Sequence, residues 1–152
     1  DLLQSVTLCD TASHMPPASM WNDRINTAQS EGMSGVAEGT LARWFTPAMH
    51  ESDPDEIARI GDMIRGTPVD GFCACCEAIK NMNQTSILSG IKLPTMIIVG
   101  EDDTGTTPDM SRIIQAEIAG SSLVILPQAA HLSNIEQAGA FNKVLLDFLA
   151  TI

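Results

Sequence analysis

The sequence predicts an α/β fold in which short parallel strands alternate with flanking helices, interrupted by a helical insertion. Residues 95–99 and 122–126 are continuous apolar runs, typical of parallel strands that are covered on both faces. A helix-forming segment lies between them, which gives a right-handed strand–helix–strand unit. Residues 18–82, in contrast, carry helical signals only. The expected protein therefore combines a sheet-based core with an all-helical insertion.

The first half of the chain opens on a predicted strand at residues 5–9, and residues 10–17 form the loop that leaves it. The third of four expected helices has the clearest limits. Asp53 suits the N-cap, Pro54 suits the first helical position, and Gly66 follows the end. The four helices are expected at about 18–29, 36–45, 54–65 and 69–81.

The second half resumes the core at about residue 93 and ends on a helix. A helix is expected to begin at Pro108 and to stop before Gly120. Ser133 and Glu136 have the spacing of a capping box, which predicts where the last helix opens. The expected divisions are a core strand and loop at 1–17, a helical cap insertion at 18–90, and the remaining core at 91–152.

Three strands are few for a sheet of this kind. The strand at residues 5–9 is apolar enough to need a neighbour on its other side, because an exposed apolar edge invites aggregation. The chain also begins with Asp1 rather than Met and opens directly on this buried-strand pattern. We therefore expect strands that lie outside this sequence, and self-association if they are absent.

Composition and charge limit the classes of function. Hydrophobic residues make up 44% of the chain, which favours a packed core, and no apolar run approaches the ~20 residues that cross a bilayer. The net charge is −11, from 19 acidic and 8 scattered basic residues, so nucleic acid is not an expected partner. We expect a cytoplasmic protein that contacts neither nucleic acid nor membrane.

The cysteines are expected to be structural. Three of the four, Cys73, Cys75 and Cys76, lack the paired C-x-x-C spacing of a zinc site. On a helix, Cys73 and Cys76 share a face with Ile79 and act as small apolar side chains. No metal or cofactor is expected, and a reducing compartment fits this pattern.

An acid and a histidine follow the two buried strands. Asp103 lies in the loop after residues 95–99, and His131 in the loop after residues 122–126. Reactive groups of open α/β sheets sit at the carboxyl ends of strands, and this order matches the second and third members of a Ser–Asp–His triad. Asp102 is the alternative acid, although the pattern of the loop favours Asp103.

The nucleophile of such a triad is missing. A Gly-x-Ser-x-Gly elbow between a strand and a helix does not occur in the sequence. Ser34 lies in the nearest similar string, Gly32-Met-Ser-Gly35, but the spacing differs and both flanking segments are helical. The sequence therefore predicts the acid and the base of a triad without its serine or its oxyanion hole.

Six segments together resemble the C-terminal portion of the 3-oxoadipate enol-lactonases, α/β-hydrolases of the β-ketoadipate pathway of aromatic catabolism. Arg43-Trp-Phe-Thr46 and Gly71-Phe-Cys-Ala-Cys-Cys-Glu-Ala-Ile79 are particular to the lactonases and close relatives, whereas the last two segments are general to α/β-hydrolases. The segments span the chain nearly end to end and lie at 8–12, 21–24, 43–46, 71–79, 94–103 and 130–136.

The resemblance implies a fold, a reaction and roles for individual residues. Asp103 becomes the triad acid, His131 the general base, and residues 18–82 a helical cap over the pocket, with the serine upstream of Asp1. The loop from Thr104 to Pro108 departs from the family's Pro-Val-Thr-Pro-Pro, so the resemblance does not predict the conformation of this loop.

The substrate implied by the resemblance is a small ester or lactone, and the family's enol-lactone also carries a carboxylate. Arg24 and Arg43 are candidates to bind that carboxylate, or else are exposed solubilising residues. Trp21 and Trp44 are candidates to touch the substrate, although packing within the cap is the stronger expectation.

Three hypotheses remain open from the sequence. The leading one is the C-terminal part of a carboxylic-ester or lactone hydrolase, working with an N-terminal half that supplies the serine. The second is a catalytically inactive fragment that persists by self-association. The third is a small general esterase that uses an unexpected serine such as Ser34.

Overall fold

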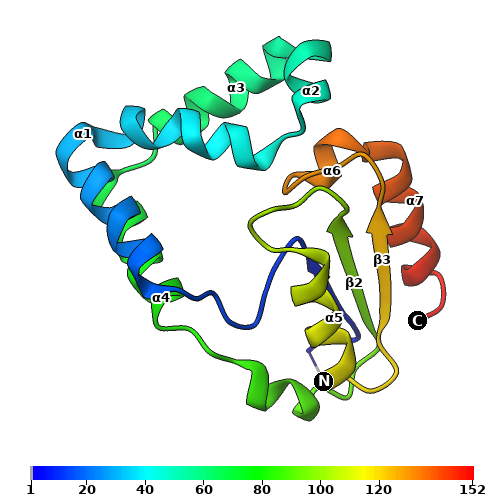
Figure 1. The fold of residues 1–152 in the computed structure, drawn as a ribbon. Helices are drawn as coiled ribbons and strands as arrows, with labels where there is room; N and C mark the ends of the chain where they lie inside the picture. The colour runs from blue at the N-terminus through cyan, green and yellow to red at the C-terminus, as the bar shows by residue number, and fades with distance from the viewer. Residues whose placement is uncertain (1) are drawn as a thin grey trace. The chain divides into compact units, whose positions relative to one another are not determined.

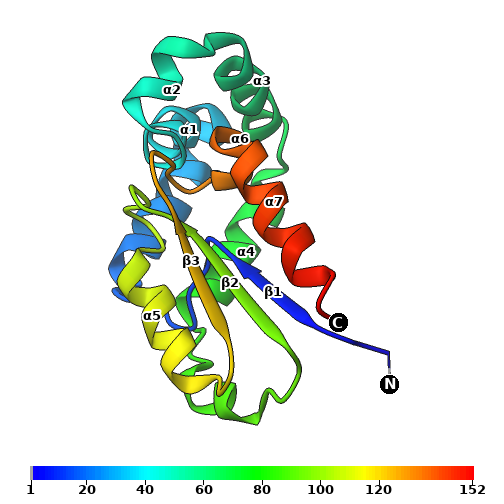
Figure 2. The same cartoon turned by 90° about the vertical axis from the view of Figure 1, so that its right-hand side faces the viewer.

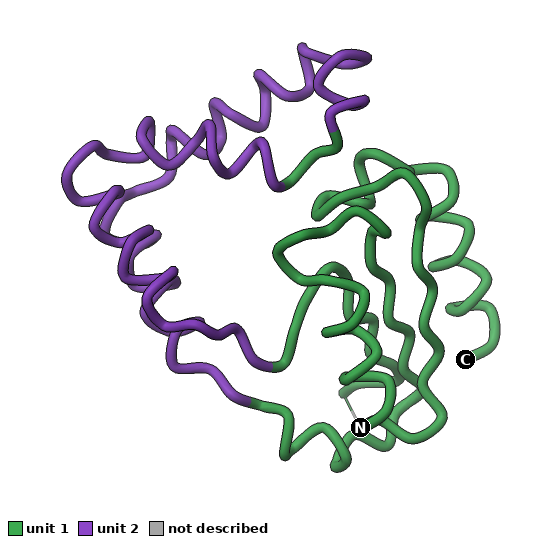
Figure 3. The backbone as a smooth tube through the Cα atoms, viewed as in Figure 1, with its two compact units in different colours: residues 1–13, 44–46, 84–152 green, residues 14–43, 47–83 purple. Residues whose placement is uncertain are grey.

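The computed structural model describes residues 2–152, and the chain divides into two compact units (Figure 3). Unit 1 holds the chain up to Ser13, residues 44–46 and residues 84–152. Unit 2 holds residues 14–43 and 47–83. Residues 44–46 and 84–90 thus group with the sheet, although the sequence placed them in the insertion at 18–90.

Unit 1 is built on a three-stranded parallel sheet in the order β1-β2-β3. The helix α5 covers one face of the sheet and α7 covers the other (Figures 1 and 2). The predicted parallel strand–helix–strand unit is confirmed, and β1 forms an edge of the sheet within the described residues. The elements of unit 1 are β1 (Val6–Cys9), η1 (Thr85–Gly90), β2 (Thr95–Gly100), α5 (Pro108–Glu117), β3 (Ser122–Leu126), α6 (Ser133–Glu136) and α7 (Ala138–Leu149).

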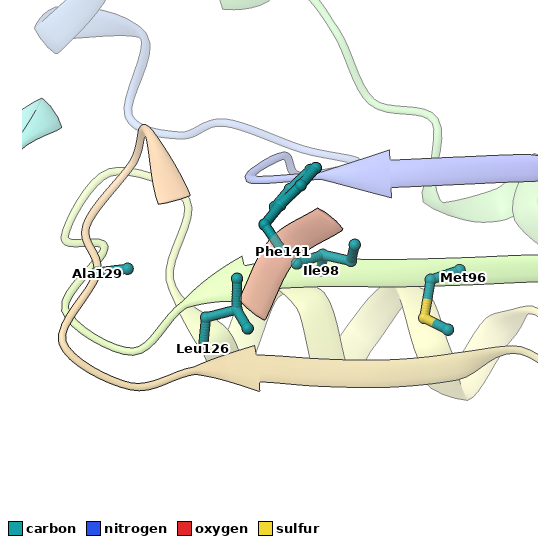
Figure 4. Packing of buried hydrophobic residues seen from close by; sticks show 5 residues of the cluster. All are labelled: Met96, Ile98, Leu126, Ala129 and Phe141. Atoms are coloured by element: carbon teal, nitrogen blue, oxygen red, sulfur yellow. The ribbon is translucent and has the colours of Figure 1, made fainter. Parts of the chain in front are cut away.

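The central strand β2 is buried along its whole length, which explains its unbroken apolar run. Successive side chains point to opposite faces of a sheet. Met96 and Ile98 accordingly belong to one buried cluster with Phe141 of α7 (Figure 4), whereas Ile97 belongs to another with Ile114 of α5. The helices on the two faces together keep this strand out of water.

Unit 2 is entirely helical. The two helices predicted at 18–29 and 36–45 form one element, α1, that is broken by a kink at Gly32, whose φ of 70° and ψ of −174° are not helical. Asp53 caps α3 as predicted, since its Oδ1 accepts the N–H of Glu56 at 3.1 Å. The sequence did not predict α2. The elements of unit 2 are α1 (Ala18–Trp44, whose last residue belongs to unit 1), α2 (Pro47–Ser52), α3 (Pro54–Arg65) and α4 (Val69–Lys80).

The cysteines form no disulfide within the described residues. All four cysteines are free, and on α4 Cys76 is buried whereas Cys75 is exposed. Between residues 2 and 152, no helix is both long and apolar enough to span a bilayer.

Two loops meet where β2 ends. Gly100 pairs with Leu126 in the parallel register, and beyond that pair the N–H of Asp102 donates to the carbonyl of Ala129 at 2.9 Å. A methyl group on Gly100 would overlap the backbone of Ala129 and Ala130. Glycine is therefore required here because the chain that leads to His131 crosses directly over this position.

We predict that Gly100→Ala lowers the free energy of unfolding by about 2–4 kcal/mol, because backbone atoms rather than a flexible side chain must move. Urea unfolding followed by circular dichroism measures the change. Gly139→Ala in α7 is the matched control, since a methyl group there meets no neighbouring atom. It should leave stability unchanged or raise it by about 0.5–1 kcal/mol. Equal effects of the two substitutions would contradict the proposed crowding.

Candidate active site

His131 and Asp103 lie together at the carboxyl ends of β3 and β2. Nδ1 of His131 is 2.9 Å from Oδ2 of Asp103. The carboxyl side chain is fully buried, whereas the imidazole is 26% exposed. The acid is thus sheltered while its partner ring remains accessible to a reacting molecule.

The acid loop is folded around the Asp103 carboxylate. Oδ1 accepts the N–H groups of Gly105 and Thr106 at 2.8 and 2.9 Å, and Oδ2 accepts the Thr106 hydroxyl at 2.7 Å. Burial alone would raise the pKa of Asp103, but the hydrogen bonds from His131 and Thr106 outweigh it and lower the pKa. The Thr104–Pro108 segment, whose geometry the sequence left open, is therefore well suited to hold an ionised carboxylate.

The carboxylate also selects the tautomer of the histidine. An ionised Asp103 can only accept hydrogen bonds, so Nδ1 of His131 must carry the proton in this pair. Thr106 Oγ1 lies 3.2 Å from the same nitrogen and reinforces the arrangement. Nε2 is then left with a free lone pair, which is what a general base requires.

Glu136 braces the loop that carries His131. Its carboxylate accepts the N–H of Thr46 at 2.9 Å, the Thr46 hydroxyl at 2.6 Å and the N–H of Ala130. The predicted capping box was therefore wrong: Leu132 is the N-cap of α6, and no side chain caps that helix. Glu136 and Ser133 bond to tertiary partners instead. The last helix is also split into α6 and α7 at Gln137, whose φ of −122° and ψ of 45° are not helical.

Trp44 lies beside the imidazole within unit 1. The centroids of the Trp44 and His131 rings are 5.8 Å apart, with their planes tilted by 30°. The carbonyl of Trp44 also accepts the N–H of Leu132 at 3.1 Å. The structure thus brings one of the predicted substrate-contacting residues to the histidine.

The other three predicted substrate residues belong to unit 2. Trp21 is buried and donates its Nε1–H to the carbonyl of Met15 at 2.8 Å. The Arg24 guanidinium lies over the rings of Trp21 and Phe72, 5.9 and 5.5 Å from their centroids. Arg43 is exposed as a residue. Desolvation of its guanidinium lowers the pKa of Arg43, and the nearby charge of Arg24 lowers it further.

The positive charges of Arg24 and Arg43 are not neutralised by nearby carboxylates in the described part of the chain. Within the described residues, neither Arg24 nor Arg43 is in an ion pair with a carboxylate, and Nε of Arg24 is buried without a hydrogen-bond partner. Neighbouring positive charges that lack an acidic partner repel one another. The pair is consequently suited to bind an anion.

Several groups near the His131–Asp103 pair, called the dyad below, were not assigned to the site from the sequence, where Glu136 was expected only to cap a helix. Thr106, Glu136 and Asp10 all hydrogen-bond within or beside it. Asp10 could have been found, because it follows a strand just as Asp103 does. The rival acid Asp102 is exposed. Over residues 2–152, no cluster of three or more His, Cys, Asp or Glu side chains could hold a metal ion.

Comparisons with known proteins point in one direction. No protein-family model matches the chain. It is 30% identical to 3-oxoadipate enol-lactonase 2 of Acinetobacter baylyi over 140 residues, which is 92% of this chain and 52% of that protein. The crystal structure of the enol-lactonase from Burkholderia xenovorans LB400 superposes with a TM-score of 0.94 at 38% identity, covering 97% of this chain and 56% of that one.

A more distant structure shows the fold alone. An α/β-hydrolase from a Medee basin deep-sea metagenome library superposes with a TM-score of 0.84 at 18% identity, covering 95% of this chain and 55% of that one. The chain therefore has the α/β-hydrolase fold and belongs to that class of proteins. Within the class it is a relative of the 3-oxoadipate enol-lactonases, so the resemblance seen in the sequence is confirmed. The chain spans about half the length of the curated relatives it matches.

We predict that Asp103→Asn lowers the free energy of unfolding by about 2 kcal/mol at neutral pH, because buried donors lose a charged acceptor. The pKa of Asp103 is lowered on folding, so the charge adds stability above the unfolded pKa of about 3.9. That stability is lost as pH falls through the folded pKa. Urea unfolding should therefore show the deficit of the variant shrinking below about pH 4. The exposed neighbour Asp102→Asn is the control, and a deficit that is independent of pH would contradict the assignment.

Proposed function

We propose that this chain supplies the acid and the general base of a hydrolase that opens a small ester or lactone. The hydrogen bond between His131 Nδ1 and Asp103 Oδ2, 2.9 Å long, carries the proposal. It leaves Nε2 of His131 free to take a proton from a nucleophile and later to protonate the leaving oxygen. Asp103 holds the tautomer and stabilises the imidazolium that forms.

The nucleophile in this proposal is a serine on a segment outside these 152 residues. The relatives are nearly twice as long as the part that this chain matches, which supports a missing segment. Such a segment would also cover the open edge at β1, where the preceding Leu2 and Leu3 are exposed. This chain then corresponds to the C-terminal part of the whole enzyme.

The chemistry follows a two-step acyl transfer. The serine oxygen attacks the acyl carbon while its proton passes to Nε2 of His131, and the ring oxygen of the lactone leaves with that proton. Water then attacks the acyl-enzyme with the same histidine as base, releasing the open acid. Trp44, with its ring beside His131, is suited to contact the acyl group.

The substrate class we propose is a lactone that bears a carboxylate, as in the 3-oxoadipate enol-lactones that the relatives are named for. Arg24 and Arg43 are the groups we assign to that carboxylate, since they lack acidic partners in a chain with a net charge of −11. Guanidinium groups bind carboxylates with strong charge-assisted hydrogen bonds. Trp21 acts indirectly by packing against Arg24.

The function is tested by joining the chain to the part of the Burkholderia enol-lactonase that it does not match, and by assaying p-nitrophenyl acetate. We predict turnover by the fusion, a loss on the order of 10³-fold or more with His131→Ala, and little change with Asp102→Asn. The 152-residue chain alone should not turn over the ester. Activity of the lone chain that is abolished by Ser34→Ala would establish the small esterase instead. An inactive fusion together with stable self-association would favour the inactive fragment.

The carboxylate site has its own test in the same fusion. We predict that Arg43→Ala raises KM for a carboxylate-bearing enol-lactone by about 10–100-fold, the effect of losing a hydrogen bond to a charged group. The neutral ester p-nitrophenyl acetate should be unaffected. Arg112→Ala is the control, because Arg112 is exposed and pairs with Asp109 on the surface. An equal rise in KM for both substrates would show that Arg43 does not bind the carboxylate of the substrate.

A further inference from the structure

Asp10 carries a second, partly buried carboxylate that interacts with the acid–base pair. It directly follows β1 and adopts a left-handed backbone conformation with φ of 45°. Its N–H donates to the carbonyl of Ile98 at 2.9 Å, which continues the pairing of β1 with β2. This backbone geometry turns the chain out of the sheet immediately after the strand.

The carboxylate of Asp10 joins the two loops that carry the dyad. Oδ1 accepts the N–H of Gly100 at 2.9 Å, and Oδ2 accepts the hydroxyl of Ser133 at 2.6 Å. Gly100 lies three residues before Asp103, and Ser133, whose side chain is fully buried, lies two residues after His131. One side chain directly after β1 thus fixes the start of the acid loop relative to the end of the histidine loop.

The surroundings of Asp10 make its ionised form less favourable than it would be in water. Burial raises the pKa of Asp10, and the nearby charge of Asp103 raises it further. The hydrogen bonds from Ser133 and Gly100, and the interaction with His131, act in the opposite direction. A hydrophobic side chain would avoid the desolvation cost if Asp10 served only to pack the sheet.

We propose that Asp10 is a positioning residue whose two hydrogen bonds, to Gly100 and to Ser133, hold His131 in register with Asp103. The role rests on the proposed function only in that the dyad is the acid–base pair of the hydrolase. We call these two hydrogen bonds the clamp. If they are lost, the loop that carries His131 is free to shift relative to the loop that carries Asp103. Nδ1 of His131 then loses the acceptor that fixes its tautomer.

The tautomer of His131 is a direct readout, and it can be measured in the 152-residue chain whether or not the hydrolase proposal holds. Long-range ¹H–¹⁵N spectra at mildly alkaline pH distinguish an imidazole protonated at Nδ1 from one protonated at Nε2. The chain has three histidines, so His14→Gln and His50→Gln identify the signals of His131. In the unaltered chain the Nδ1–H form should dominate.

Three variants separate the hydrogen bonds from the charge. Asp10→Asn suits the left-handed backbone and keeps both bonds, because the amide oxygen can accept from Gly100 and the Ser133 hydroxyl can rotate to accept. Asp10→Gly removes both bonds without backbone strain. Ser133→Ala removes one bond and leaves the carboxylate.

We expect Asp10→Asn to retain the Nδ1–H form. Asp10→Gly and Ser133→Ala should each reduce the ratio of Nδ1–H to Nε2–H by about tenfold, the scale of one lost hydrogen bond. Cys9→Ala, a change on β1 that removes packing against the core but leaves the clamp intact, is the control and should retain the Nδ1–H form.

Two results would overturn the proposal. In the first, the tautomer ratio in Asp10→Gly equals that in Cys9→Ala, which makes the role purely structural. In the second, Asp10→Asn changes the ratio as much as Asp10→Gly does, which makes the charge rather than the clamp decisive. If Asp10→Gly does not fold, Ser133→Ala, which loses a single hydroxyl, provides the test. A tautomer ratio in Ser133→Ala equal to that in Cys9→Ala would then contradict the proposal.

Discussion

The parallel register of β2 against β3 is the constraint on which the site depends. Pairing of Gly100 with Leu126 ends the two strands at the same level. The chain that leaves β3 must then cross the end of β2, and the absence of a side chain at Gly100 lets Ala129 and Ala130 approach its backbone. This crossing brings His131 to Asp103, although 28 residues separate them in the sequence.

The site is rich in carboxylates, and hydrogen bonds rather than basic side chains stabilise them. Within residues 2–152, the hydrogen-bond partners of Asp103, Glu136 and Asp10 are backbone N–H groups, hydroxyl groups and the imidazole of His131. Each carboxylate thereby fixes a turn of the loops. An imidazolium formed at His131 would meet negative charge already oriented toward it, so little reorganisation is needed.

Within the described residues, two basic residues of unit 2 lack the acidic partners that most other basic residues have. Arg24 and Arg43 lie close enough to affect one another, while most other basic residues, such as Arg59, Arg65, Arg112 and Lys143, are paired with acids three or four positions away on their own helices. Such surface pairs contribute little to stability. The unpaired arginines therefore stand out in an acidic chain, and the chemistry of guanidinium groups explains why we assign them to a carboxylate.

The sequence by itself determined the α/β class, the two parallel strands at 95–99 and 122–126, the capped helix at Asp53, and the choice of Asp103 and His131; of these, only the burial of the second strand was predicted wrongly, because β3 lies at an edge of the described sheet and is partly exposed. These follow from local periodicity and from the rule that reactive groups follow strands. Tertiary structure decided the rest. Ser133 and Glu136 match a helix cap in sequence but bond to Asp10, Thr46 and Ala130 instead. Trp44 lies beside His131 because a long-range backbone bond holds it there, and no local pattern encodes a contact between residues so far apart.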